Sequence, residues 1–206
     1  MASHQFFATD IHQESLTSTH GWLELNDDLE AFALSLAEED TAGIRWCEEN
    51  GYDGYTSYSS LDDLTRRASC FEELHQLLQP RIVRIALLHQ WELRSSKIVL
   101  DNMWVNVLEP GGAHTGHVHP HCILSGTYYV STPPDCSAIR FEDPRLQMMM
   151  AAPALRQDCD PERRRFVSFE PAAGDLLVWE SWLRHEVPTN RARDVRISIS
   201  FNFRLD

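Results

Sequence analysis

The stretch of residues 109–130 constrains this chain more than any other, because it carries four of the ten histidines in a segment with the character of extended backbone. His117 and His119 lie two positions apart. Side chains two apart on a β-strand leave the same face, so their imidazoles would lie side by side, as two ligands of one metal ion must. Residues 123–130 are rich in aromatic and β-branched types, which predicts that the strand continues from the histidines. A histidine-rich surface loop is the alternative.

A third metal ligand must come from elsewhere in the chain, and His185 is the best-placed candidate. It follows the apolar run 176–179, which is short enough to be a buried strand, so it lies near a strand end. His114 and His121 compete as ligands, but Pro120 bends the strand before His121, and we expect neither to bind. The expected metal ligands are His117, His119 and His185.

Residues 195–203 alternate strictly between apolar and polar types, which predicts a strand with two unlike faces. Ile197 and Ile199 would pack in a core, while Arg196 and Ser198 would share a polar pocket wall. An arginine buried there is costly without an anion, and its guanidinium can bind a carboxylate through two parallel hydrogen bonds. A surface or ion-paired arginine is the alternative.

The first hundred residues are expected to be mainly helical. A helix should start at residues 26–28, where acidic and capping side chains precede an apolar stripe. Residues 69–72 fit a capping box before a second stripe, in which Pro80 should bend the helix or begin another. Residues 6–16 are a candidate opening strand, and residues 51–60 read as an ordered, aromatic loop.

The second half is expected to consist of strands joined by turns. Residues 144–161 form a long segment without periodicity, which predicts a lid or substrate loop, with a variable surface loop as the alternative. Residues 146–165, together with residues 51–60, should border the mouth of the site and select the substrate. The expected strands cover residues 98–108, 123–130, 138–141, 166–169, 176–179 and 195–203.

Length and charge narrow the function classes. The 206 residues favour one compact domain, and the net charge of −13 makes a nucleic acid an unlikely partner. No apolar run approaches the ~20 residues of a membrane span, and the first residues carry no basic or apolar leader, so we expect no membrane association and a cytoplasmic protein. Five widely spaced cysteines without a CxxC pair favour reduced thiols.

The ligand pattern, with His-x-His followed 66 positions later by His185 and then by Arg196-x-Ser198, resembles the Fe(II)- and 2-oxoglutarate-dependent oxygenases. The resemblance extends from residue 103 to residue 203 and is closest to an uncharacterised bacterial and phage branch. The segments that carry it are 104–106, 117–120, 125–130, 141–145, 174–185 and 196–202.

The resemblance implies an α+β, mainly β fold. This is a double-stranded β-helix (a cupin-like jelly-roll), with one domain spanning 1–206, helical support from 1–96 and the jelly-roll core in 97–206. It also implies that the three histidines bind Fe(II), and that 2-oxoglutarate chelates the metal while Arg196 and Ser198 hold its distal carboxylate. Tyr129 is a candidate second carboxylate contact. The reaction implied is hydroxylation of an unidentified small molecule or peptide, and a homodimer is possible.

The chain departs from the superfamily at one position, because the second ligand is usually Asp or Glu and here is His119. A missing carboxylate could come from Glu109, Glu142 or Asp143 only if the chain folded back. Two other functions stay open: a cupin-type dioxygenase or isomerase that uses three histidines without an oxo acid, and a non-catalytic jelly-roll that holds zinc. Arg196 argues against the cupin-type enzyme.

Overall fold

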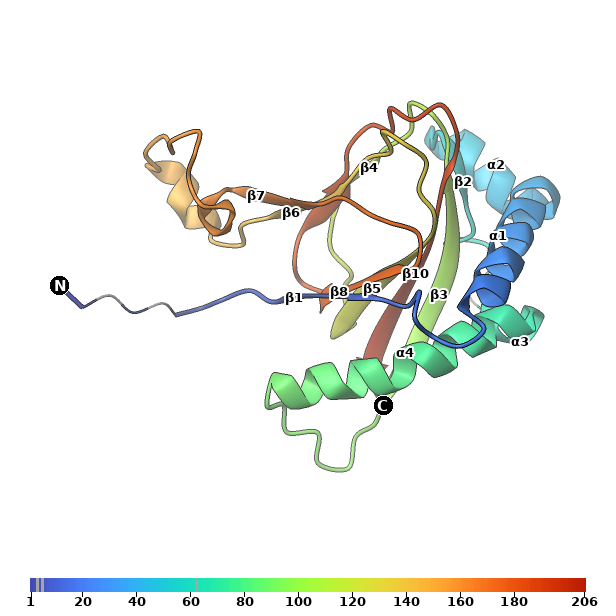
Figure 1. The fold of residues 1–206 in the computed structure, drawn as a ribbon, viewed down its shortest axis with the longest axis horizontal. Coiled ribbons are helices and arrows are strands. Elements are labelled where there is room, and N and C mark those ends of the chain that lie inside the picture. Colours follow the sequence, from blue (N-terminus) through green and yellow to red (C-terminus); the bar gives the residue numbers. More distant parts are fainter. Residues whose placement is uncertain (3, 5, 62) are drawn as a thin grey trace.

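The computed structural model describes residues 1–2, 4, 6–61 and 63–206. Two antiparallel sheets face each other, and helices lie against the outer face of the larger sheet (Figure 1). The larger sheet contains, in spatial order, β1 (Ile11–Ser15), β8 (Asp175–Glu180), β5 (Leu124–Ser131), β10 (Arg196–Leu205), β3 (Ile98–Leu108) and β2 (Gly54–Thr56). The smaller sheet contains β4 (His114–His117), β9 (His185–Val187), β6 (Ile139–Glu142) and β7 (Phe166–Phe169). This confirms the predicted double-stranded β-helix.

The helices come from the first half of the chain, as predicted, and two short 3-10 turns lie between β6 and β7. The helical elements are α1 (Trp22–Glu39), α2 (Thr41–Asn50), α3 (Leu64–Arg67), α4 (Ser69–Leu88), η1 (Leu146–Met150) and η2 (Pro161–Arg163). Among the described residues no helix is long and apolar enough to cross a membrane. All five cysteine thiols are free.

Strand β10 lies between β5 and β3 in the large sheet and separates the two cores of the protein. Its residues Ile197, Ile199 and Phe201 are fully buried against the helices. Each such side chain contributes about 1.5–3 kcal/mol of burial free energy. Arg196 and Ser198 face the space between the two sheets, where a smaller apolar cluster also lies. The alternation predicted for residues 195–203 is confirmed.

The predicted histidine strand is wrong. Strand β4 ends at His117, and the chain then turns before β5 begins at Leu124 in the other sheet. The turn contains Pro120, which has no N–H to donate to a ladder, and His121, whose φ of 69° is left-handed. His119 therefore lies beyond the strand, and the parity argument that paired it with His117 does not describe the backbone.

Helix α1 begins earlier than predicted, at Trp22 after Gly21, whose φ is 74°. Asn26 is not a cap but a buried side chain inside the helix. Its amide donates to the carbonyl of Val130 at 3.2 Å and accepts from the hydroxyl of Tyr128 at 2.8 Å. A polar residue that reads as a helix start therefore attaches the helix to β5, and no local pattern reveals that contact.

Two further predictions in the first half need correction, those on the capping box and on the aromatic loop. The capping box does not form, because Ser69 is already helical and the residue before it, Ala68, has no side chain that can cap. Of the two alternatives for the apolar stripe around Pro80, the single long helix is observed, since α4 continues through Pro80 to Leu88. Strand β2 lies inside the predicted aromatic loop, since three residues at a sheet edge are too few to show alternation. The opening strand is confirmed, but only over β1.

Asp40 caps α2 and connects it to the segment that carries β2. Its carboxylate accepts from the backbone N–H of Gly43 at 3.1 Å, from the Tyr55 hydroxyl at 2.8 Å and from the Ser60 hydroxyl. Partial burial raises the pKa of Asp40, but the bonds from Ser60, Gly43 and Tyr55 outweigh burial and lower it below the ordinary 3.8. The folded state therefore binds a proton at Asp40 less readily than the unfolded chain does.

We expect Asp40→Ala to reduce the free energy of unfolding by about 1–2 kcal/mol at pH 7, the usual cost of losing an N-cap. The difference from wild type should be complete above the unfolded pKa and shrink as the pH falls through the lower folded pKa. Urea unfolding at several pH values measures both effects. Asp28→Ala, which removes an exposed carboxylate within α1, is the control and should change stability little. Equal stabilities for the Asp40 variant and wild type at pH 7 would contradict the capping role.

Candidate metal and cosubstrate site

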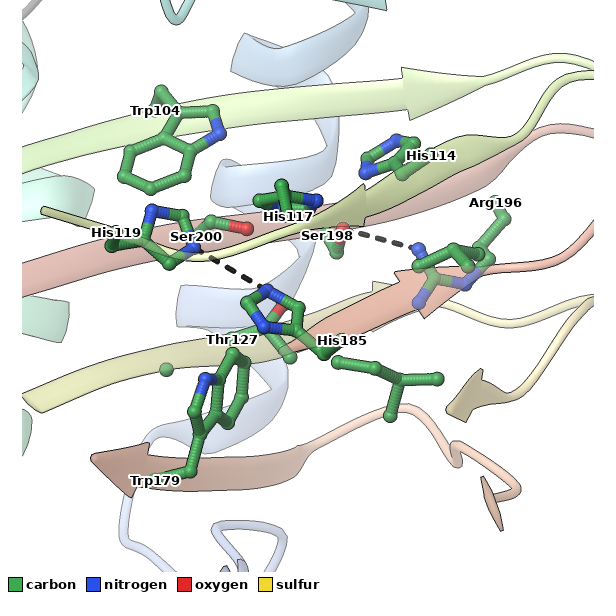
Figure 2. A pocket seen from close by; sticks show the side chains of 13 residues that line it. Trp104, His114, His117, His119, Thr127, Trp179, His185, Arg196, Ser198 and Ser200 are labelled. Atoms are coloured by element: carbon green, nitrogen blue, oxygen red, sulfur yellow. Dashed lines mark hydrogen bonds between the residues drawn. The ribbon is translucent and has the colours of Figure 1, made fainter. Parts of the chain in front are cut away.

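Three histidines meet at one end of the space between the two sheets. β4 pairs with β9 so that His117 lies opposite His185, and their ring centroids are 4.3 Å apart. The backbone N–H of His119 donates to the carbonyl of Ser181 at 3.0 Å, which holds the chain after β4 against the segment before β9. The Nε2 atoms of His119 and His185 are 3.3 Å apart (Figure 2). One nitrogen from each of the three rings lies within 4.8 Å of the others.

Backbone carbonyls fix which ring nitrogens face the cluster. His117 Nδ1 is 2.7 Å from the carbonyl of Thr115, and His185 Nδ1 is 3.0 Å from the carbonyl of Leu183. A carbonyl can only accept, so each Nδ1 must carry the proton. Each Nε2 is then unprotonated and available to bind a metal, which is the arrangement that orients histidine ligands in metalloproteins.

Burial keeps these imidazoles neutral. Burial and then the neighbouring His117 lower the pKa of His119 to about 4. Burial, again followed by His117, lowers the pKa of His185 to about 2, and burial also lowers the pKa of His117 itself. A neutral imidazole is the form that binds a metal ion.

The spacing between the His119 and His185 nitrogens fits a metal ion. Two nitrogen ligands about 2.0–2.1 Å from one ion are roughly 2.8–3.4 Å apart at bond angles between 90° and 110°. The 3.3 Å between His119 and His185 lies in this range. Imidazole suits Fe, Zn, Cu and Ni alike, so the donor set fits Fe(II) without selecting it.

Neither of the competing histidines joins the cluster. His114 lines the same cavity, but its Nε2 is 2.6 Å from the Tyr52 hydroxyl and so already has a partner. Burial, followed by the charge of Arg196, lowers the pKa of His114 to about 3. His121 is exposed in the turn after β4.

The carboxylates that might have completed the ligand set are occupied or remote. Glu142 accepts from Arg165 at 2.8 Å and from Arg184 at 3.0 Å, and Asp143 pairs with Arg145. Of the described residues that line the cavity, none is acidic. The candidate metal ligands are therefore three neutral groups.

Arg196 lies across the cavity from the histidines and has no carboxylate partner among the described residues. Its side chain is only 1% exposed, and one guanidinium nitrogen donates to the Ser198 hydroxyl at 3.3 Å. The guanidinium carbon is 4.9 Å from the centre of the Tyr129 ring. Arg196 Nε and the Tyr129 hydroxyl are buried without any hydrogen-bond partner. Burial, opposed by Arg196, raises the pKa of Tyr129 to about 12, so its hydroxyl stays protonated and can donate.

The cavity between these two ends measures about 50 Å³. Its lining includes Trp104, Thr127 and Trp179, to which the sequence analysis gave no role. Thr127 could have been found from its position two residues before Tyr129 on the same strand face. Tryptophans at inward positions read only as core, and nothing local showed that they border a site.

The two predicted substrate segments differ in their relation to the cavity. From the aromatic loop, the Tyr52 hydroxyl is hydrogen-bonded to His114, and Tyr58 makes a T-shaped contact with Trp104, with ring centroids 5.1 Å apart. The segment 144–161 forms the end of the β6–β7 hairpin, which extends away from the barrel (Figure 1), and none of its described residues lines the cavity. The structure therefore does not show the predicted lid over the metal.

The fold and the site define a jelly-roll protein with a candidate metal site at its open end, and comparison with known proteins identifies the family. Residues 102–202 match the sequence profile of the family described as "Putative 2OG-Fe(II) oxygenase". This chain belongs to the Fe(II)- and 2-oxoglutarate-dependent oxygenases, with Fe(II) and 2-oxoglutarate as cofactors. The bacterial and phage branch stays a prediction. No curated protein matches the sequence.

Solved structures support the fold. The epimerase SnoN from nogalamycin biosynthesis, in complex with Fe³⁺, alpha-ketoglutarate and nogalamycin RO, has a TM-score of 0.61 at 14% identity, over 95% of this chain and 79% of that one. A Pseudomonas putida prolyl-4-hydroxylase has a TM-score of 0.54 at 16% identity, over 95% and 93%. A Burkholderia pseudomallei oxidoreductase of the 2OG-Fe(II) oxygenase family has a TM-score of 0.42 at 18% identity, over 53% of this chain and 46% of that one, and this partial match contributes nothing to the assignment of the fold. At these identities the likeness establishes the fold alone.

The cluster predicts different outcomes for two neighbouring histidines. We expect His119→Ala to bind less than a tenth of one equivalent of Fe(II) or Zn(II) at micromolar concentrations, because a ligand nitrogen is lost from a site that has only three. His114→Ala is the matched control and should bind close to one equivalent, since its nitrogen is bonded to Tyr52. Elemental analysis after dialysis against the metal distinguishes them. Full occupancy in the His119 variant, with loss in the His114 variant, would show that the ligand set is wrong.

Proposed function

We propose that His117, His119 and His185 bind the Fe(II) of this oxygenase, and that Arg196, Ser198 and Tyr129 bind the distal carboxylate of 2-oxoglutarate. The observation that carries the assignment is the buried guanidinium of Arg196, which has no anionic partner among the described residues and faces the histidines across one cavity. The family requires Fe(II) and a dianionic oxo acid, and the chain offers neutral metal ligands at one end of this cavity and a cation at the other.

The distal carboxylate finds two kinds of donor at Arg196. The guanidinium can form charge-assisted bonds with it, and the Tyr129 hydroxyl, buried and protonated, can donate another. Ser198 already accepts from Arg196, so its own proton is free to be donated to the carboxylate. The oxo acid would thus satisfy polar atoms that the protein leaves without partners.

The same residues orient the reaction. Bound together, Fe(II) and 2-oxoglutarate would activate dioxygen: the oxo acid would give two electrons as it loses CO₂, the substrate C–H bond would give the other two, and one oxygen atom would end in succinate and the other in the hydroxyl group of the product. Arg196 fixes the oxo acid at its far end, so that its 2-oxo group is directed toward the histidines. Trp104 and Trp179 line the cavity with apolar surface and limit the access of water.

The two other functions considered for this chain are less well supported. A cupin-type enzyme without an oxo acid, or a zinc-binding protein without activity, would leave the buried Arg196 without an anion, which is costly. Neither would explain the match of residues 102–202 to the oxygenase family.

Exposed apolar side chains next to residues of the cavity favour a substrate with an apolar or aromatic part. Tyr58 is 53% exposed and makes a T-shaped contact with Trp104, which lines the cavity. Val118, which lies in sequence between His117 and His119, is 43% exposed, and Trp182, next to Ser181, is 49% exposed.

Four further points stay predictions: whether the substrate is a small molecule or a peptide, a role of residues 146–165 in selecting it, a homodimer and a cytoplasmic location.

Replacing Arg196 tests the cosubstrate assignment. We expect Arg196→Met to keep its metal and fold but to bind 2-oxoglutarate about 2–5 kcal/mol more weakly, the usual cost of truncating one partner of a buried charge pair. Anaerobic calorimetry on the Fe(II) protein gives the affinities. Arg204→Met is the control, because this exposed arginine pairs with Asp101 away from the cavity, and it should bind like wild type. Equal affinities for wild type and the Arg196 variant would contradict the assignment.

A further inference from the structure

Trp179 carries a buried hydrogen-bond donor that the proposed function leaves unused. Its side chain is 2% exposed, and its indole Nε1 has no hydrogen-bond partner in the described part of the chain. Buried donors in native proteins nearly always have acceptors, so an unsatisfied one indicates a group that binds there.

The indole lies at the histidine end of the cavity. Its ring centroid is 4.7 Å from that of His185 in a T-shaped contact, and it is 5.0 Å from the ring centroid of Phe141 in a second T-shaped contact. Figure 2 shows the ring rising from β8 toward His185, with Thr127 beside it. Trp179 is itself part of the cavity wall.

The unsatisfied buried polar atoms of the cavity fall into two groups. Arg196 Nε and the Tyr129 hydroxyl form the group far from the histidines, where the guanidinium carbon of Arg196 is 4.9 Å from the centre of the Tyr129 ring. The Trp179 ring lies beside His185 in the cavity wall, so an acceptor that reaches its Nε1 from the cavity would be an oxygen near the candidate metal site. Because no acidic residue is among the described residues that line the cavity, the only anion that can supply this oxygen is the bound ligand.

We propose that Trp179 is a cosubstrate-binding residue whose indole N–H donates to the metal-chelating carboxylate of 2-oxoglutarate. This inference rests on the proposed function. A carboxylate is a stronger acceptor than a neutral carbonyl, and the bond is charge-assisted. The proposed protein ligands are all neutral, and no described residue that lines the cavity is acidic, so the chelating carboxylate would be the negative group next to the metal. The Trp179 N–H, fixed beside this carboxylate, would favour one orientation of the bound oxo acid.

The test compares two oxo acids in the Fe(II) protein under anaerobic conditions. Trp179→Phe keeps an aromatic ring against His185 and removes only the donor. We expect this variant to bind both 2-oxoglutarate and pyruvate about tenfold more weakly, the usual effect of losing one charge-assisted hydrogen bond. The factor should be similar for the two, because both chelate a metal through a 2-oxo group and the adjacent carboxylate. Arg196→Met should weaken the binding of 2-oxoglutarate but not that of pyruvate, since pyruvate has no distal carboxylate. Trp22→Phe, which removes an indole donor outside the cavity that bonds to the Tyr128 hydroxyl at 2.9 Å, is the matched control and should leave both affinities unchanged.

The visible charge-transfer band of the Fe(II)–oxo acid complex reports the affinities and also the chelation itself. We expect the band to shift in Trp179→Phe at saturating oxo acid and to keep its wild-type position in Trp22→Phe. An unchanged band and unchanged affinities in Trp179→Phe would overturn the inference. Loss of metal from this variant would also overturn it, because it would show that the indole only supports His185 by packing.

A second measurement uses the wild-type protein. In a zinc-loaded, ¹⁵N-labelled sample the six tryptophans give six indole resonances, and the Trp179 signal is the one missing from Trp179→Phe. We expect its proton to move downfield and to exchange more slowly when 2-oxoglutarate is added. A wild-type protein that binds neither oxo acid would refute the proposed function itself. Binding without any change at Trp179 would refute only this inference.

Discussion

The antiparallel pairing of β4 with β9 is the interaction on which the rest of the site depends. It pairs His117 with His185 on neighbouring strands of the small sheet, although these residues are far apart in the sequence. The backbone bond from His119 to Ser181 then holds the turn after β4 against the turn before β9 and delivers the third ring. Each element of the cluster is therefore positioned by main-chain hydrogen bonds, and the carbonyls of Thr115 and Leu183 orient the rings.

Electrostatics determines what this scaffold can bind. The chain carries a net charge of −13, yet the described lining of its cavity contains four neutral imidazoles and a buried arginine, without an acidic residue. A buried charge without a partner costs several kcal/mol, and an anion that spans the cavity offsets this cost. A metal held by three neutral ligands keeps its full positive charge, so the site favours a dianionic cosubstrate at both of its ends.

The structural features that were predicted best from the sequence are those that depend on the alternation of apolar and polar residues along a strand. The apolar face of β10 and the polar face with Arg196 and Ser198 follow from a period of two, and both are buried as predicted. The sequence failed where a contact between distant segments overrides the local pattern. Asn26 reads as a helix cap but bonds to Val130 and Tyr128. His119 was paired with His117 by strand parity, but a turn at Pro120 brings it to the cluster by another route. The buried donor of Trp179 could not be seen, because an unsatisfied atom is a property of the folded cavity.

A crystal structure of the protein grown anaerobically with Fe(II) and 2-oxoglutarate tests the central claim most directly, namely that a three-histidine site without a protein carboxylate chelates the oxo acid. The account predicts one iron bound by Nε2 of His117, His119 and His185, two oxygens of 2-oxoglutarate on the same iron, and the distal carboxylate against Arg196. Iron bound by Glu109, Glu142 or Asp143, or an oxo acid that does not reach Arg196, would contradict it.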